Sequence, residues 1–348
     1  LGFDTQDFEV LKQSYEELFP YEPIFFLDEI QNVPNWEKFA RRLADQKYKV
    51  YITGSNAKML SGEIATTLGG RFFMHNIYPY SFKEYLNASN IAIPDNFDYQ
   101  NNSEIIRTFA QYFTFGGLPE LHDVPPIEKR LWLSSLYNKI FFGDLISRYS
   151  IRNDMALKVL VRKLADSVKQ PTSFNRMANV VSSTGQKIKT DTVIEYLKYL
   201  EETWLIFSIE NISSKLNDKV SNKKYYFIDN GILNLFLTDG NTSLFENMLA
   251  IHLRHHYAHE LFYYLKDVEV DFYLYDSQIA IQACYNMSDI STRNREVGDL
   301  IKFAKVFPCK KLYIVTNDEE YEMEESGFKI SVVPLWKFLI LDCLKTKV

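Results

Sequence analysis

Between Pro23 and Asn56 the sequence places polar side chains at the ends of two successive apolar runs, and this stretch constrains the fold most strongly. The first run covers residues 24–27, which is too short for a helix and predicts a strand buried on both faces. Asp28 and Glu29 follow directly, so both acids stand at the carboxyl end of that strand. In open α/β proteins, ligands bind at the carboxyl edge of the parallel sheet. The stretch therefore predicts an active-site edge.

The second apolar run covers residues 50–53 and ends in Gly54, Ser55 and Asn56. An amphipathic helical pattern over residues 36–46 lies between the two runs. Together they predict a strand, helix, strand unit with polar tips on one edge.

Further elements are expected downstream of this unit. A helical pattern over residues 58–68 ends at two glycines, after which Arg71 opens a third predicted strand over 72–77. The segment SFKEYL predicts a short helix in which Ser81 and Glu84 form a capping box.

Composition places the chain among ordinary globular proteins. It has 348 residues, of which 46% are hydrophobic and 24% charged, and its net charge of −6 creates no general attraction for nucleic acid. Cys284, Cys309 and Cys343 are scattered, which predicts neither a disulfide framework nor a zinc site. No apolar run approaches the roughly 20 residues that span a bilayer, so we expect a cytoplasmic protein without a membrane partner. The first residue is Leu1, and we expect residues before it to be missing.

A buried strand that ends in Asp-Glu suits a nucleotide hydrolase of the P-loop class. Asp28 is then expected to hold Mg²⁺ through water, and Glu29 to polarise the attacking water. Ser55 or Asn56 could face the γ-phosphate as a sensor, and Arg71 could offset charge in the transition state. The alternative is a strand that simply enters a helix, where acids are favourable near the N-terminus.

The chain resembles a large prokaryotic family of AAA-type ATP-binding proteins. Matching segments include FFLDEIQNVPNWEKF, VYITGSNAKMLSGEIATTLGGRFF and IYPYSFKEYL, followed by FGGLPEL, FFGDLISRY, TVIEYLKYLEETWLI and YYFIDNGI. The resemblance implies that Asp28 and Glu29 are the Walker B acids, that Ser55 and Asn56 form the sensor tip, and that ATP and Mg²⁺ are the cofactors. It also implies a C-terminal domain of unknown function.

One element of that family is missing from the sequence. The phosphate-binding pattern G-x-x-x-x-G-K-[ST] occurs nowhere in the chain. Without its backbone amides and its lysine, phosphate loses most of its favourable contacts. We therefore expect this polypeptide to bind ATP weakly or not at all, whereas a full-length parent would bind and slowly hydrolyse it.

Three helical patterns followed by two strands, over residues 153–230, predict a winged helix. Lysines around its recognition helix and wing could contact DNA phosphates, as could the first residue of that helix. The alternative is a packing module with a solvated lysine face. The candidate DNA contacts are Lys187, Lys189, Thr190, Lys215, Lys219, Lys223 and Lys224.

The C-terminal region resembles the PD-(D/E)XK nuclease fold. Glu246 on a helix, Asp271 on a strand and Gln282 on the next strand follow the order of its metal-binding residues. Cys284 stands at the lysine position, and a thiol cannot stabilise an attacking hydroxide as an ammonium does. We therefore expect a nuclease-like fold whose chemistry has lapsed. A metal site on the histidines between residues 252 and 259 is an alternative.

These observations predict an α/β multidomain protein. The expected parts are a partial P-loop AAA-type domain over residues 1–88, a helical linker over 89–152, a winged helix over 153–230 and a restriction-endonuclease-like domain over 231–348. The expected function is ATP binding and hydrolysis coupled to the winged helix and the nuclease-like domain. Alternatives are a DNA-binding or nuclease-related protein and a non-catalytic scaffold, with an unknown protein partner and possible oligomerisation.

Overall fold

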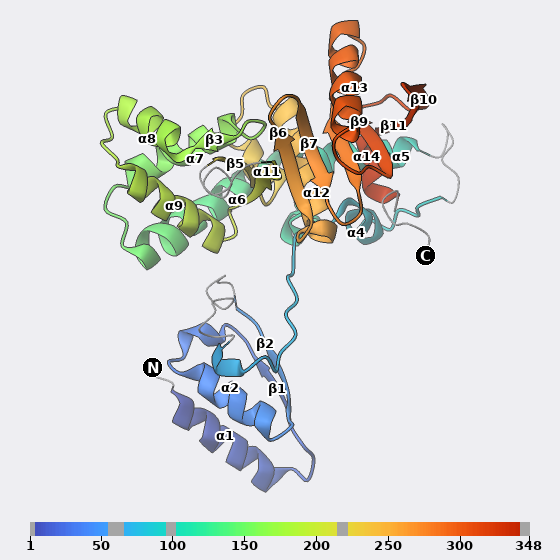
Figure 1. Cartoon of the computed structure of the whole chain (residues 1–348). Coiled ribbons are helices and arrows are strands. Elements are labelled where there is room, and N and C mark those ends of the chain that lie inside the picture. The colour runs from blue at the N-terminus through green and yellow to red at the C-terminus, as the bar shows by residue number, and fades with distance from the viewer. Residues whose placement is uncertain (1–3, 55–65, 95–101, 214–221, 342–348) are drawn as a thin grey trace. The chain divides into compact units, whose positions relative to one another are not determined.

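The computed structural model describes residues 4–54, 66–94, 102–213 and 222–341. Its mixed α/β chain divides into two compact units, one formed mainly by residues up to Ile77 and one from Tyr78 onward (Figure 1). In the described part of the chain, no helix combines the length and the apolar character that crossing a bilayer requires.

The first unit is built on a two-stranded parallel sheet. Strand β1 pairs in register with β2, from Ile24 opposite Lys49 to Leu27 opposite Ile52. Phe8 stacks on Phe39 with ring centroids 4.8 Å apart, and Phe25 meets Phe39 edge-on at 6.3 Å. These contacts place both helices on one face of the sheet. The elements are α1 (Thr5–Leu18), β1 (Ile24–Leu27), η1 (Ile30–Asn32), α2 (Trp36–Asp45) and β2 (Lys49–Ile52).

Among the described residues of the first unit, no element covers the opposite face of this sheet. Ile24, Phe26 and Tyr51 are 53%, 73% and 55% exposed. The prediction of a strand buried on both faces is therefore wrong for β1, because α1 and α2 both cover the side that carries Phe25.

The third strand predicted in the first unit does not form. Residues 72–77 have no assigned strand, and Phe73 and Ile77 are 95% and 94% exposed. A strand is stable only when its backbone groups bond to a neighbour. In the described residues of this unit β1 and β2 pair only with each other, so the apolar run alone does not produce a strand.

The second unit combines twelve described helical segments with a large sheet. Ser81 and Glu84 form the predicted capping box at the start of α4. The helical segments are α4 (Phe82–Ala88), α5 (Ser103–Phe115), η3 (Pro119–Leu121), α6 (Pro126–Lys139), η4 (Ile140–Ser147), α7 (Asp154–Asp166), α8 (Phe174–Ser183), α9 (Thr190–Glu202), α11 (Asn230–Asn234), α12 (Asn241–Tyr257), α13 (Ile290–Ala304) and α14 (Leu335–Ile340).

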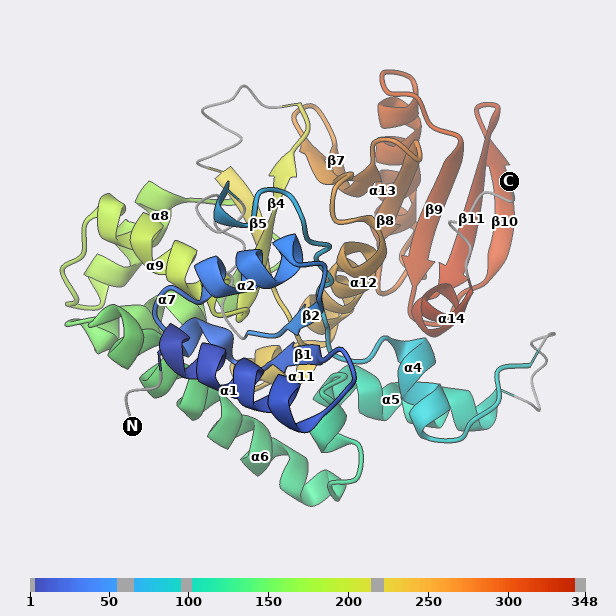
Figure 2. The same cartoon turned by 90° about the horizontal axis from the view of Figure 1, so that it is seen from below.

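The sheet of the second unit has the strand order β10-β11-β9-β8-β7-β6-β4-β5-β3, and Figure 2 shows β8, β9, β11 and β10 side by side. Leu300 and Phe303 of α13 share a hydrophobic core with Ile314 and Ile330 from the sheet. The strands are β3 (Thr172–Ser173), β4 (Ile206–Asn211), β5 (Asn222–Phe227), β6 (Leu261–Leu265), β7 (Glu269–Leu274), β8 (Ile279–Ala283), β9 (Lys311–Thr316), β10 (Tyr321–Glu325) and β11 (Phe328–Pro334).

Strand β4 joins the two parts of this sheet. It pairs antiparallel with β5 and parallel with β6, where Glu210 and Asn211 lie opposite Phe262 and Tyr263. The predicted winged-helix hairpin is thus continuous with the C-terminal sheet.

A buried carboxyl group holds two distant segments of the second unit together, in what we call the Asp229 junction: Gly116, Gly117, Asp229, Asn230 and Gly231. The Gly117 N–H donates to Asp229 Oδ2 at 2.8 Å, and the Gly231 N–H donates to Oδ1 at 2.8 Å. The Asn230 side chain donates to the carbonyl of Phe113 at 3.0 Å. Burial raises the pKa of Asp229 to about 6, although its backbone hydrogen bonds act in the opposite direction.

Candidate functional site

The polar tips of β1 and β2 meet at the carboxyl edge of the first unit's sheet. Thr53 directly follows β2, and its N–H donates to the carbonyl of Leu27 at 3.0 Å. The Thr53 hydroxyl donates to Asp28 Oδ1 and accepts the Glu29 N–H at 3.2 Å. One threonine therefore binds the carboxyl group of Asp28 and the backbone of Glu29, and its side chain was not singled out from the sequence.

Glu29 turns the chain away from the strand. Its backbone is left-handed, with φ 48° and ψ 38°, a conformation that is uncommon for a residue with a side chain. Gln31 donates a hydrogen bond from its amide to Glu29 Oε2. A backbone held in a sparsely populated region is a feature that clusters at functional sites.

The structure does not bring Arg71 together with the acids. Arg71 pairs with Asp45, the last residue of α2, which leads into the start of β2. It therefore lies toward the amino edge of the sheet, away from Asp28. Ser55 and Asn56, the predicted sensor residues, lie outside the described residues.

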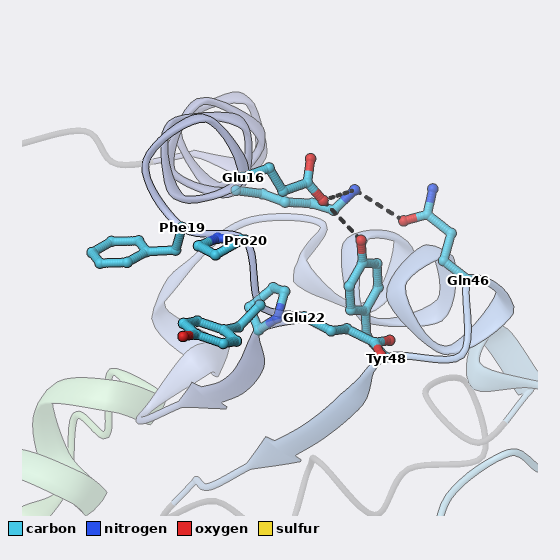
Figure 3. A pocket seen from close by; sticks show the side chains of 9 residues that line it. Glu16, Phe19, Pro20, Glu22, Gln46 and Tyr48 are labelled. Atoms are coloured by element: carbon cyan, nitrogen blue, oxygen red, sulfur yellow. Dashed lines mark hydrogen bonds and ion pairs between the residues drawn. The ribbon is translucent and has the colours of Figure 1, made fainter.

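A shallow hollow in the first unit also lies at that amino edge (Figure 3). Within it, Tyr48 donates to Glu16 at 2.8 Å, and Lys12 pairs with Glu16 at 3.4 Å and donates to Gln46 at 3.2 Å. These four polar groups therefore bond to one another within the hollow.

In the second unit, two of the predicted nuclease-like residues, Glu246 and Asp271, meet at a lysine. Lys224 Nζ lies 3.3 Å from Glu246 Oε1, 2.9 Å from Asp271 Oδ1 and 3.1 Å from Glu269 Oε1. Tyr226 donates to Glu246 Oε1 at 2.8 Å. We call Lys224, Glu246, Glu269 and Asp271 the Lys224 cluster.

Burial and charge pairing act against each other in the Lys224 cluster. Burial alone would lower the pKa of Lys224, but the carboxylates of Asp271 and Glu246 outweigh it and hold that pKa well above its usual value. Burial raises the pKa of Glu246 to about 7, against the opposing effect of Lys224. A buried charge is tolerated when it is paired and hydrogen-bonded in this way.

Gln282 reaches the Lys224 cluster through Asp271, whereas Cys284 lies in a hydrophobic core. Gln282 accepts the Asp271 N–H at 2.8 Å and donates to Glu296 at 2.5 Å. Cys284 packs in the core beside α13, and burial raises the pKa of its thiol to about 12. The thiol is therefore neutral and inert at physiological pH.

The predicted DNA contacts fall into separate environments. Lys187 and Lys189 are exposed before α9, whereas Thr190 donates to Asn175 and Lys223 pairs with Glu210 at 3.2 Å. Lys224 does not fit the predicted role of a DNA contact, because its side chain is completely buried. Lys215 and Lys219 lie outside the described residues.

The histidine alternative gains no support from the geometry. Across the described ranges, no group of three or more His, Cys, Asp or Glu side chains could hold a metal ion. His255 instead stacks on Tyr78 with ring centroids 4.3 Å apart, and burial lowers its pKa to about 4.

Comparison with known proteins supports the first part of the prediction. Residues 2–86 match a family described as an AAA domain, and residues 106–243 match a domain of unknown function, DUF8612. The N-terminal domain is therefore of AAA type, which indicates a nucleotide-binding, ATPase-like function.

Two relatives match longer parts of the chain. The uncharacterized protein MJ1544 of Methanocaldococcus jannaschii is 34% identical over 328 residues, which cover 90% of this chain and 74% of that protein. An uncharacterized protein of Haemophilus influenzae is 31% identical over 232 residues, which cover 66% of this chain. The chain matches only 56% of the length of the second relative.

Proposed function

Because this chain belongs to the same family as the archaeal protein MJ1544 and carries an AAA-type domain, we propose that it acts in ATP binding and in Mg²⁺-dependent ATP hydrolysis. The observation that carries the proposal is the pair of acids at the carboxyl edge of β1, where Thr53, the residue after β2, binds the Asp28 carboxyl group and the Glu29 backbone N–H. The phosphate-binding loop is not part of this sequence, so the proposal concerns a protein in which that loop is present.

Asp28 and Glu29 fit two different tasks. A carboxylate with its remaining lone pairs at a sheet edge suits Mg²⁺, which keeps several waters and binds through few carboxylates. The metal would neutralise charge on the phosphates. Asp28 would hold it through water, while Glu29 would orient the attacking water and accept its proton. The Thr53 hydroxyl holds the Asp28 carboxyl group and the Glu29 backbone, and the Gln31 amide donates to the Glu29 carboxylate. Arg71 would need a partner other than Asp45 to act at this edge.

Replacing Glu29 with glutamine tests this proposal. In a protein that includes the phosphate-binding loop, we expect phosphate release to fall at least about tenfold, because the amide cannot accept a proton from water. Calorimetry should show unchanged Mg-ATP affinity. Glu17→Gln on the exposed side of α1 is the matched control and should leave the rate unchanged. Equal turnover in the Glu29→Gln variant and the wild type would contradict the proposed role.

We infer that the middle of the chain is a winged helix. In support, α7, β3, α8 and α9 precede the hairpin β4–β5, and β3 pairs antiparallel with β5 through Thr172 and Lys223. DNA binding is a second candidate function, supported by the exposed Lys187 and Lys189 before the helix that would enter the groove.

If DNA binds there, the double variant Lys187→Ala/Lys189→Ala should weaken duplex binding about tenfold at low salt. Each lost phosphate contact lowers the number of counterions that the DNA releases on binding. Fluorescence anisotropy over a salt series measures both affinity and slope. The double variant Lys305→Ala/Lys310→Ala, from the other end of the unit, controls for net charge. An identical loss in both variants, or no binding at low salt, would argue against this interface.

We also infer a nuclease-like C-terminal domain without nuclease activity. The succession α12, β6, β7, β8, α13 and β9 supports it, as does the approach of Glu246, Asp271 and Gln282 to one another. The domain limits at residues 88, 152 and 230, a protein partner, an oligomeric form and a cytoplasmic location stay predictions of the sequence.

A further inference from the structure

Two elements that are separate in the sequence bring three carboxylates to one point in the second unit. Glu246 comes from α12, while Glu269 and Asp271 come from β7. The ammonium of Lys224 stands between them at 2.9–3.3 Å, which are hydrogen-bond distances. An ammonium has three donor hydrogens and no acceptor, so it can serve each of the three carboxylates.

Such a group of carboxylates requires a cation. Without one, the charges would repel each other in a setting where Glu246 is 4% and Asp271 9% exposed. Divalent metals take carboxylate oxygens at about 2.0–2.6 Å, with several oxygens per ion. With the ammonium standing among them, these carboxylates are not arranged as the ligands of a metal ion, and no other group of His, Cys, Asp or Glu side chains in the described residues is. The cluster is thus matched in size and donor number to the ammonium.

Lys224 is also buried in the core and does not lie at the surface. It lies on β5, its side chain is fully buried, and its Nζ lies 5.6 Å from the centre of the Tyr263 ring. The other oxygen of Asp271 accepts the Ala283 N–H at 3.0 Å. The cluster is closed on several sides by bonds within the chain.

We propose that Lys224 is an internal cation, which takes the place that a divalent metal ion would occupy among Glu246, Glu269 and Asp271. The inference goes beyond the proposed ATPase and does not depend on it. Since a strand of the hairpin β4–β5 supplies the cation, the same interaction fixes that hairpin to α12 and β7. The wild-type cluster therefore has no need of a metal, and removal of the lysine should create a metal site.

The test compares Mn²⁺ binding by the wild-type chain and by Lys224→Ala, which removes the ammonium and leaves space for a hydrated ion. Isothermal calorimetry and the electron paramagnetic resonance signal of free Mn²⁺ report binding. Thermal unfolding with MnCl₂ shows whether Mn²⁺ binding stabilises the folded chain. NaCl at equal ionic strength and EDTA serve as controls. We expect no saturable binding and no Mn²⁺-dependent shift of the melting temperature for the wild type. For Lys224→Ala we expect stoichiometric binding and a melting temperature raised by Mn²⁺, or folding that occurs only with Mn²⁺.

Two further variants show whether any gained Mn²⁺ binding belongs to the Lys224 cluster. Lys223→Ala removes the neighbouring lysine, which pairs with Glu210, and should behave as the wild type toward Mn²⁺. Adding Asp271→Asn to Lys224→Ala should abolish the gained binding. The proposal is overturned if the wild type binds Mn²⁺ and loses it on Asp271→Asn. It is equally overturned if Lys224→Ala, folded or unfolded, gains nothing from Mn²⁺.

Discussion

Replacing Gly231 with alanine is expected to destabilise the second unit by about 3 kcal/mol or more, at the upper end of the cost of overpacking. A Cβ atom at this position would lie 2.1 Å from the carbonyl oxygen of Phe115 and 2.7 Å from its carbon. Both atoms belong to the backbone, so no side chain can rotate to relieve the overlap. Urea unfolding followed by circular dichroism should show the loss as a lower midpoint.

Gly298→Ala in α13 provides the matched control. A Cβ atom there would meet nothing within 4 Å. Alanine in the interior of a helix is favoured over glycine by about 0.5–1 kcal/mol, so this variant should be slightly more stable than the wild type. If both glycine variants unfolded at the same urea concentration, the close approach at Gly231 would be refuted.

Replacing Asp229 with asparagine is expected to cost about 2–3 kcal/mol near pH 4.5. Each carboxyl oxygen accepts at least one buried backbone N–H, from Gly117 on one side and from Gly231 on the other. An amide has a single acceptor oxygen, so one of these N–H groups would face an NH₂ group. The loss should appear in the midpoint of urea unfolding at fixed pH.

The wild type and the Asp229→Asn variant should also differ in how their free energy of unfolding depends on pH. The pKa of Asp229 is raised from 3.8 to about 6, so between these values the folded state keeps a proton that the unfolded chain has lost. The stability that this group contributes is fully present below pH 4 and falls as pH rises toward 6, by up to about 3 kcal/mol. Asparagine does not titrate, so the deficit of the variant should shrink from pH 4.5 to pH 7. Gly298→Ala changes no titratable group, so its stability difference from the wild type should show no such trend. A deficit that grows with pH would exclude a raised pKa.

Local patterns predicted many of the elements because local chemistry determines them. The apolar run over Ile24–Leu27 became β1 with the same limits, and Ser81 caps α4 as its spacing to Glu84 indicated. Strand limits also depend on backbone conformation: β4 begins at Ile206, two residues after Trp204, whose backbone is left-handed with φ 56°. Strand β10, rich in glutamate, was missed because an edge strand can expose charged side chains and lacks an apolar signal.

The predictions that failed depended on contacts between distant residues. Whether residues 72–77 form a strand depends on a neighbour to pair with, which an apolar run cannot reveal. Lys224 was grouped with surface lysines, although it stands two residues before Tyr226 in a strand whose next residues are buried. Period-two alternation places Lys224 and Tyr226 on the same side of β5, and that pattern could have indicated a buried lysine.

The Asp229 junction has a consequence for the synthesis of this protein. The hydrogen bond from Gly117 to Asp229 joins residues 112 positions apart. Loop closure of this length must precede the contact, and such non-local contacts slow folding. On a ribosome, α5 emerges long before α11, the helix that later packs against it. The C-terminal end of α5, where the Phe113 carbonyl accepts a hydrogen bond from Asn230, lacks this partner until more than a hundred further residues have been synthesised, and it is a natural place for a chaperone to act during translation.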